Sequence, residues 1–313
     1  MLKYSIKRII LAFITAFIIL TLTFLLVKSL PPQRIVSSNI NTCWAFYLNQ
    51  CNLGYMVEMH EEHTELGECI AKFINFNGKD YYFYQRPVLD QYSSWLKNII
   101  TKWDWGYSTA IKPGVSTVEI IKERIPLTIS VNIVSVILSV PLGIGLGIWA
   151  GLKKNTWVDH TISTLVMIFI SIPSFVVISF LIYFFAFKGN LPMRWPTDDD
   201  TMRNKILAYI IPVTALSFGS VCHYCRFVRA ELCEVMSSEY LLLARTKGLT
   251  KRQAIIRHAL RNAFVPILPS ILAEFIGVFS GSLVLENLYN INGIGNLYIE
   301  ALNNKDYNVL MVD

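Results

Sequence analysis

The chain has 313 residues, of which 53% are hydrophobic and only 16% are charged, and its mean hydropathy is +0.45. These values are too apolar for an ordinary soluble domain, so we expect an integral membrane protein. The net charge of +6 could suit nucleic acid, but the cations gather beside apolar segments, as they do at a cytoplasmic membrane face, which argues against nucleic-acid binding.

The first 30 residues place three cations before an apolar run from Ile9 to Val27. A signal peptide opens similarly, but its apolar core usually holds about 7–15 residues and a small-residue cleavage site follows. This run is longer, and Lys28 to Pro32 offers no such site. We therefore predict that residues 1–30 are an uncleaved transmembrane helix with a cytoplasmic N-terminus.

Residues 31–124 form a polar region that this topology places outside the cell. Cys43 and Cys51 could close a small disulfide loop there, because thiols outside the cytosol can oxidise, and Cys69 would then be the odd one. From Val88 apolar residues recur at helical spacing as far as Ile100, which predicts a helix.

An acidic cluster in the same region lies beside His60 and His63. Together these side chains could bind a metal ion, but a solvated acidic face explains the same composition. We favour the acidic face and predict no metal site. The acidic residues are Glu58, Glu61, Glu62, Glu65 and Glu68.

A second span is predicted at residues 127–151, where Gly143, Gly147 and Gly151 recur every four residues. Small residues at this spacing let two membrane helices approach closely, so this face should pack on a neighbour. The glycines do not form a phosphate loop. The pattern G-x-x-x-x-G-K-(S/T) is absent from this sequence, so we predict that the chain does not bind ATP itself.

Residues 161–187 form a third predicted span with Pro173 near its middle. A proline there frees a backbone carbonyl and can bend the helix. The bend either lines a passage or serves packing alone. Residues 188–205 would be an outer loop, and a fourth span at 206–225 ends in a C-x-x-C pair that we interpret as packing rather than as a metal or redox site.

A basic segment, residues 226–263, separates this span from the last one. Its pattern predicts two short helices joined at Gly248, which is a candidate left-handed stop, with cations in the preceding turn. Thr250 and Gln253 are spaced as a capping box for the second helix. We interpret the segment as a docking element.

The fifth predicted span, residues 264–285, contains Glu274, the clearest ionisable residue inside a predicted span. Such a group is costly in lipid, so it should face protein, water or a partner. Glu274 is either part of a passage or a hydrogen-bonded structural carboxyl.

The basic segment resembles the cytoplasmic coupling loop of ABC importer permeases, the EAA motif, in the version of the peptide/nickel branch. That version reads approximately (D/E)-Y-x-x-x-A-R-x-K-G-L, then H-A-L-R-N-A, then Pro. Leu242 and Arg261 depart from the wider EAA pattern, which weakens an assignment to sugar or amino-acid importers. The residues matching its first part are Glu239, Tyr240, Ala244, Arg245, Lys247, Gly248 and Leu249, and those matching its second part are His258, Ala259, Leu260, Arg261, Asn262, Ala263 and Pro266.

The tail resembles the same family, in its motif E-x-(V/L)-(F/Y)-x-x-P-G-(L/I)-G and a later D-Y, although Asn292 stands where Pro is usual. The family pattern implies one more transmembrane helix here, so we expect the final span to be missing from this sequence. The matching residues are Glu286, Gly293, Gly295, Asp306 and Tyr307.

The resemblance implies an all-α polytopic membrane protein with the type I ABC importer transmembrane fold. Residues 125–313 would form that domain, and residues 31–124 a long extracellular loop between the first two spans. The chain would be a bacterial plasma-membrane permease that imports oligopeptides or dipeptides by alternating access. It would perform no bond chemistry and bind no cofactor.

The implied partners are a second homologous permease, two ATPase subunits that hold ATP and Mg, an extracellular substrate-binding protein, and membrane lipid. The seven residues that match the first part of the coupling-loop motif, from Glu239 to Leu249, would contact an ATPase subunit. Pro173 and Glu274 would lie on the translocation path, where Glu274 could contact the amino terminus of a peptide.

Other functions stay open at this point. Nickel, haem or another small cargo would fit the same family. An ATP-independent secondary transporter should show inverted repeats or several buried charges, and neither is evident here. A receptor anchored by its spans would not need several glycine-rich ones.

Overall fold

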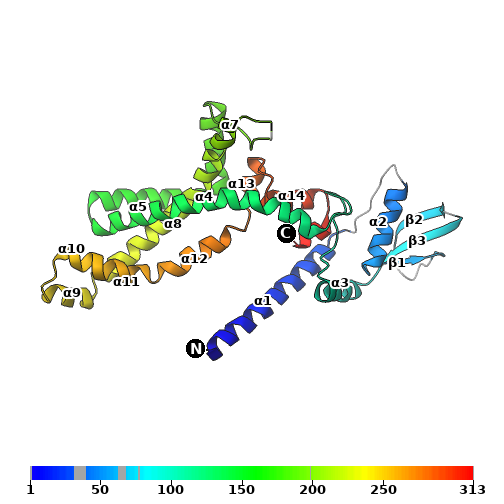
Figure 1. Cartoon of the computed structure of the whole chain (residues 1–313), viewed down its shortest axis with the longest axis horizontal. Coiled ribbons are helices and arrows are strands. Elements are labelled where there is room, and N and C mark those ends of the chain that lie inside the picture. Colours follow the sequence, from blue (N-terminus) through cyan, green and yellow to red (C-terminus); the bar gives the residue numbers. More distant parts are fainter. Residues whose placement is uncertain (1, 32–39, 63–67, 77, 198, 313) are drawn as a thin grey trace. The chain divides into compact units, whose positions relative to one another are not determined.

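The computed structural model describes residues 2–31, 40–62, 68–76, 78–197 and 199–312. The chain divides into two units, Met1–Lys122 with Glu300–Asp313, and Glu123–Ile299. Most described residues are helical, as the predicted fold class requires. Figure 1 shows the elements of both units.

The first unit begins with α1 (Leu2–Lys28), a helix whose apolar side chains are mostly exposed. A helix of this length whose apolar side chains are exposed is suited to a lipid environment. Near its end Phe24 is fully buried and packs against Tyr92 and Trp95 of α3 (Val88–Lys102), at ring-centroid distances of 5.4 and 4.9 Å. The predicted helices at both positions are therefore confirmed.

A three-stranded antiparallel sheet lies between these two helices in the chain, and the sequence analysis did not predict it. Its strands are β1 (Met56–Met59), β2 (Cys69–Phe76) and β3 (Lys79–Gln85), in the order β1-β3-β2. Helix α2 (Ile40–Asn52) lies beside the sheet (Figure 1). It buries Tyr47 against Phe73 and Phe83.

The possible Cys43–Cys51 disulfide does not fit this structure. Both residues lie on α2, eight positions apart. A helix rises about 1.5 Å per residue, so their Cα atoms are roughly 12 Å apart, whereas a disulfide needs about 7 Å or less. Of the proposed metal-binding side chains, His63 and Glu65 lie outside the described residues. His60 packs on the Tyr81 ring.

The tail closes the first unit through Asp306, which is fully buried just before α15 (Tyr307–Val312). Its carboxylate accepts hydrogen bonds from the Ser108 hydroxyl and from the backbone N–H groups of Thr109, Ala110 and Ile111, at 2.5–3.2 Å. Several donors satisfy the hydrogen-bonding capacity of this buried carboxylate. Asp306 therefore fixes the loop at residues 108–111 onto the tail.

The second unit is helical throughout its regular elements. It comprises most of α4 (Thr117–Leu152), then α5 (Trp157–Ile170), α6 (Ser174–Leu181), the π-helical turn η2 (Ile182–Phe187), α7 (Met202–Leu207), α8 (Ile210–Met236), α9 (Glu239–Thr246), α10 (Lys251–Ala254), the π-helical turn η3 (Ile255–Ala259), α11 (Leu260–Phe264), α12 (Ile267–Gly277), α13 (Leu283–Leu288) and the start of α14 (Ile294–Asn303).

Three helical stretches of the described chain are long and apolar enough to cross a membrane, and two bent pairs raise the number to five. The single stretches are Lys3–Lys28, Thr117–Leu152 and Met202–Met236. The pairs are Trp157–Ile170 with Ser174–Phe187, bent by 98°, and Lys251–Phe264 with Ile267–Gly277, bent by 51°.

These boundaries differ from the predicted spans in four places. Helix α4 begins at Thr117, ten residues before the predicted start at 127. Residues 161–187 are not one kinked helix, because α5 ends at Ile170 and α6 begins at Ser174. Helix α8 continues eleven residues beyond the predicted end at 225, into the predicted coupling loop. Helix α12 ends at Gly277, eight residues before the predicted end, where glycine and serine follow and disfavour helix.

The glycine face of α4 packs on α8, as predicted. A Cβ on Gly143 would lie 2.8 Å from the Val221 carbonyl oxygen, and one on Gly147 would lie 2.7 Å from the Cys225 carbonyl oxygen. Only glycine leaves room for this approach. The C-x-x-C pair is buried there among Val166, Leu146 and other apolar side chains, in keeping with packing.

A buried ion pair ties α5 to α8. Asp159 is fully buried, and its carboxylate accepts hydrogen bonds from Nε and an NH2 group of Arg229, at 2.5 and 2.8 Å. The Asn155 backbone N–H donates to the same carboxylate at 3.0 Å. The beginning of α5 is thus fixed to α8 a few residues before α8 leads into α9.

Candidate functional site

The predicted helix–glycine–helix unit is present at residues 239–264. Gly248 has φ +93° and ends the first short helix, and the Thr250–Gln253 capping box is formed, with hydrogen bonds of 3.1 and 3.3 Å. Glycine adopts this left-handed conformation without the steric cost that a β-carbon adds. The local geometry predicted from sequence is therefore confirmed.

Helix α9 divides the residues of the coupling motif into a buried and an exposed set. Leu241 and Ala244 are buried in a cluster with Leu232, Ala254 and Ala259. The exposed set is Glu239, Tyr240, Leu242, Leu243, Arg245 and Lys247, while Leu249 is half-buried and packs on the same cluster. Within the motif, Ala244 and Leu249 hold α9 in place, and the others are available to a partner.

A cavity of about 220 Å³ lies beside α9, between it and α10. Glu239, Arg245 and Lys251 bring charge to its lining, and Leu241, Leu242 and Ile255 bring apolar surface. Exposed apolar side chains rimmed by charge are typical of a protein-binding surface. The arrangement agrees with the interpretation of this segment as a docking element.

Pro173 lies at the break between α5 and α6 and is the N-terminal cap of α6. It does not line the largest cavity described below. Its neighbours Ile172 and Ser174 line a separate cavity of about 260 Å³ with Gly219, His223 and Arg226 of α8. The structure thus places the proline at a 98° turn of the chain beside this smaller cavity.

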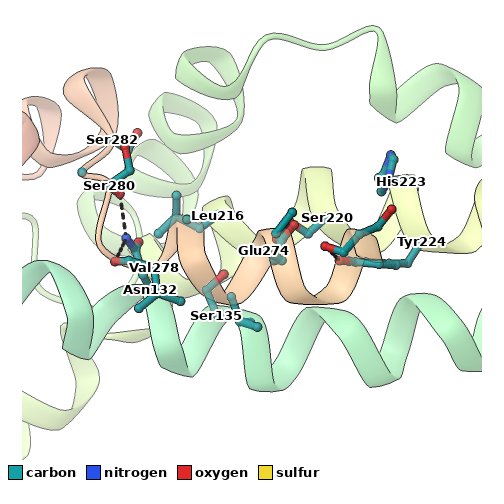
Figure 2. Close-up of a pocket in the computed structure, with 15 residues that line it drawn as sticks. Asn132, Ser135, Leu216, Ser220, His223, Tyr224, Glu274, Val278, Ser280 and Ser282 are labelled. Atoms are coloured by element: carbon teal, nitrogen blue, oxygen red, sulfur yellow. Dashed lines mark hydrogen bonds between the residues drawn. The ribbon is translucent and has the colours of Figure 1, made fainter. Parts of the chain in front are cut away.

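The largest cavity described, about 520 Å³, lies among α4, α8, α12 and the segment that follows α12 (Figure 2). The helices around this cavity are mostly apolar, but its lining is rich in polar groups. Each of the surrounding elements contributes at least one hydroxyl, amide or carboxylate group. The polar residues in the lining are Asn132, Ser135, Ser220, His223, Tyr224, Ser270, Glu274, Ser280 and Ser282.

Glu274 projects from α12 beside this cavity and is partly exposed. The Ser220 hydroxyl of α8 donates a hydrogen bond to its Oε1 atom. The Tyr224 hydroxyl, one turn further along α8, donates to the Ser270 carbonyl oxygen at 3.1 Å. The predicted intramembrane carboxylate therefore lies at a polar contact between two helices, with one side on the cavity.

Asn132 explains how the chain turns after α12. Its Nδ2 group donates to the carbonyl oxygens of Val278 and Ser280, each at 2.9 Å (Figure 2). These hydrogen bonds satisfy backbone groups that the end of α12 leaves unpaired. Sequence reasoning did not single out Asn132, although an amide inside the predicted span at 127–151 is a signal of a buried polar contact.

Glu286 is a second buried acid, with 3% of its surface exposed. Its carboxylate accepts hydrogen bonds from the Thr128 hydroxyl at 3.0 Å and from the Asn296 backbone N–H at 3.1 Å. Burial raises the pKa of Glu286, which lies outside the candidate spans. A Cβ on Gly293 would lie 2.3 Å from the Thr128 oxygen, so the glycine leaves space for this contact.

The tail motif therefore has a physical role that sequence reasoning identified only by resemblance. Gly281 and Gly295 approach so closely that a Cβ on the former would lie 2.2 Å from the backbone nitrogen of the latter. Glu286, Gly293 and Gly295 form a packed junction between α4, α13 and α14. No three of the described His, Cys, Asp and Glu residues form a group that could hold a metal ion.

Comparison with known proteins agrees with these features. The model of the family described as binding-protein-dependent transport system inner membrane component matches residues 143–312. The dipeptide transport system permease protein DppB of Bacillus subtilis (strain 168) is 30% identical over 313 residues, covering 99% of this chain and 89% of that protein. The oligopeptide transport system permease protein OppB of Escherichia coli (strain K12) is 30% identical over 311 residues, covering 99% and 90%.

Among solved structures, a chain of the MetNI methionine ABC transporter aligns with a TM-score of 0.47 and 17% identity, over 62% of this chain and 89% of that chain. The family match spans more than half of the sequence, and the relatives span nearly all of it. The chain therefore belongs to the family of binding-protein-dependent transport system inner membrane components, as a multi-pass permease subunit of an ABC transporter.

Proposed function

We propose that this permease imports oligopeptides or dipeptides by alternating access. The observation that carries the proposal is the polar cavity around Glu274, which lies among otherwise apolar helices of the second unit. Its volume of about 520 Å³ is within the range of roughly 300–1,000 Å³ that small-ligand pockets occupy. Peptide is favoured as cargo because the similar proteins are named dipeptide and oligopeptide permeases.

The lining chemistry also suits a peptide. Hydroxyl and amide groups can exchange hydrogen bonds with a peptide backbone, and none of them binds one side chain exclusively. A passage for peptides of different sequence needs this kind of lining. Nickel would prefer several nitrogen or carboxylate ligands close together, and among the described residues Glu274 and His223 are the only such groups in this cavity.

The exposed face of α9 is the proposed contact with an ATPase subunit. Leu242 and Leu243 supply apolar surface there, and Arg245 and Lys247 supply charge. Closure of two partner ATPases on ATP and Mg would displace α9. Such a displacement shifts the permease only if the ATPase contacts differ between its two conformations.

Helix α8 supplies the mechanical link between α9 and the cavity. It runs without interruption from Ile210 to Met236, carries Ser220 and Tyr224 in the cavity lining, and ends three residues before α9 begins. The Asp159–Arg229 ion pair adds α5 to the same rigid body. A push on α9 would therefore move two helices of the second unit together.

The remaining partners follow from the same proposal. A second homologous permease would complete the passage, and an extracellular binding protein would deliver the peptide. Lys3, Lys7 and Arg8 in the first turns of α1 support a cytoplasmic N-terminus in a bacterial cell, because cytoplasmic segments are rich in Lys and Arg. Residues 31–124, including the small sheet, would then lie outside the membrane.

The test is ATP-dependent uptake of a labelled short peptide into proteoliposomes that hold the permease pair, ATPases and binding protein. Gly248→Val should abolish most uptake while membrane insertion persists, because a β-branched residue resists φ +93°. Gly248→Asn is the matched control, since Asn tolerates the left-handed conformation, and it should retain most uptake. Peptide uptake without the ATPases, or uptake indifferent to Gly248→Val, would contradict the proposal.

A further inference from the structure

We infer that Glu274 binds the positively charged amino terminus of a peptide in transit, so that the cavity selects peptides whose α-amino group is free. The inference rests on the proposed peptide-import function and concerns the same cavity. Peptide import requires only that the cavity admits peptides. Here one residue, Glu274, recognises one chemical group, the α-ammonium group.

The first reason is the charge of the cavity. Glu274 is the only Asp or Glu in its lining, and the lining includes no Lys or Arg among the described residues. No ion pair of Glu274 is found in the described part of the chain. A carboxylate among apolar helices is costly without a partner of opposite charge, so the cavity favours a cationic ligand group.

The second reason is that Glu274 keeps unused hydrogen-bonding capacity. An ionised carboxylate can accept about four hydrogen bonds. The Ser220 hydroxyl donates to its Oε1 atom, and Tyr224 also interacts with it, so part of this capacity stays available to a ligand. The side chain is partly exposed to the cavity, so a ligand can reach it.

The third reason is the set of acceptors around the carboxylate. An ammonium group has three N–H donors and no acceptor. The Ser220 hydroxyl donates to Glu274 and the Tyr224 hydroxyl donates to Ser270, so both hydroxyl oxygens can still accept. One carboxylate and two hydroxyl oxygens in one neighbourhood match the three donors of an α-ammonium group (Figure 2).

The rest of the cavity is uncharged when His223 is neutral and can accommodate the peptide backbone. Ser135, Ser280 and Ser282 line it on the side of Asn132, away from Tyr224 (Figure 2). Hydroxyl groups both donate and accept, so they bind backbone amides without demanding one sequence. Selection would therefore act on the amino terminus and leave the side chains free to vary.

The first measurement is competition in the complex without its binding protein, so that the binding protein's own preference cannot contribute. A benzophenone-bearing tripeptide with a free amino terminus is photo-crosslinked to the permease. Trialanine or N-acetyl-trialanine is the competitor. In the wild type, trialanine should compete at a concentration roughly tenfold or more below that of the acetylated peptide, the factor expected for a hydrogen bond to a charged group.

Glu274→Gln should remove this preference, because the amide keeps the shape of the side chain but not its charge. Glu274→Asp keeps the charge and should retain most of the preference, which guards against a loss caused by misfolding. Glu119→Gln, an exposed acid near the start of α4, is the matched control and should behave as the wild type. If Glu274 has a structural role alone, Glu274→Gln should lower crosslinking of the probe and leave the ratio between the two competitors' effective concentrations as in the wild type.

The second measurement separates this inference from the function on which it rests. ATP-dependent trialanine uptake is assayed in the wild-type complete complex. Uptake in the wild type together with an unchanged amino-terminal preference in Glu274→Gln would overturn the inference and leave the function standing. An absence of wild-type peptide uptake would overturn both. Wild-type uptake together with crosslinking that fails, or with competition that ignores acetylation, would overturn the inference alone.

Discussion

The two acids of the second unit, Glu274 and Glu286, lie in contrasting surroundings. Glu286 is 3% exposed and accepts hydrogen bonds from a threonine hydroxyl and a backbone N–H, with glycines packed around it. Glu274 is partly exposed, faces a cavity of about 520 Å³ and has acceptor capacity left over. Both residues interrupt apolar sequence, so they look alike in a hydropathy profile.

The difference teaches how a structural acid can be distinguished from one available to a ligand. Around Glu286 the chain supplies a hydroxyl and a backbone N–H as donors, and the backbone at Gly293 packs so closely on Thr128 and Glu286 that no ligand fits beside the carboxylate. Around Glu274 the chain supplies the Ser220 hydroxyl, with Tyr224 nearby, and leaves space beside the carboxylate. A buried carboxylate enclosed by the chain's own donors indicates a structural role, and a partly exposed one beside a cavity indicates a binding role.

The largest effect is expected from truncating the two acids in parallel. Glu286→Ala leaves the Thr128 hydroxyl and the Asn296 N–H without their acceptor, and each unsatisfied buried group costs about 1–3 kcal/mol, so the free energy of unfolding should fall by roughly 3 kcal/mol. Glu274→Ala should lower it by less than about 1 kcal/mol, because its contacts with Ser220 and Tyr224 are partly exposed and water in the cavity can replace them.

Thermal or denaturant unfolding of the purified permease in detergent measures both changes. Equal destabilisation by the two variants would break the distinction between the acids. It would also show that Glu274 belongs to the packing of α12 on α8.

The next effect concerns the contact between α4 and α8, which forms one wall of the cavity. Gly147→Ala would place a methyl group 2.7 Å from the Cys225 carbonyl oxygen, and overpacking of this kind costs about 1–3 kcal/mol. Gly145→Ala is the matched control on the same helix, because no atom lies within 4 Å of its added Cβ. The control should be neutral or slightly stabilising, since alanine favours helix. A control as unstable as Gly147→Ala would show that the packed face is assigned wrongly.

Features set by neighbouring residues were predictable from the sequence, and those that join distant residues were not. The Gly248 turn and the Thr250–Gln253 capping box depend on a few consecutive residues, and both are present. The apolar runs predicted helices for the same reason. In contrast, Thr128 and Glu286 are 158 positions apart, and nothing in the sequence pairs them.

Two further misses have a physical explanation. The break at Pro173 is sharper than a proline kink because Ser171 and Ile172 also leave the helix, and the resulting 98° turn depends on packing against α8. The sheet in residues 56–85 was missed although the aromatic run Tyr81–Tyr84 has high strand propensity. Its strands are stable only with α2 packed on them, which no local pattern reveals.

The pH dependence of stability offers a sharper test of the Glu286 environment. Burial raises the pKa of Glu286, so between its unfolded and folded pKa values the folded protein binds more protons than the unfolded chain. Its contribution to stability is therefore fully present below the unfolded pKa and is lost as pH rises through the folded pKa. Unfolding measured from pH 4 to 7 should show this decline in the wild type and not in Glu286→Gln. A decline that persists in the variant would assign the effect to another group.

The smallest effect is expected from Ser220→Ala, which removes the hydroxyl that holds Glu274. The free energy of unfolding should fall by about 1 kcal/mol or less, because the hydrogen bond is partly exposed and the carboxylate can turn toward water in the cavity.

Transport by Ser220→Ala should change more than its stability does. A binding role for Glu274 predicts weaker uptake of free-amino peptides, since the carboxylate loses its fixed orientation and one acceptor oxygen is gone. Ser179→Ala, which removes a hydroxyl bonded only to its own helix, is the control. If Ser220→Ala weakens uptake no more than Ser179→Ala does, the Ser220–Glu274 contact serves packing. Glu274 and Glu286 would then differ only in how exposed their side chains are.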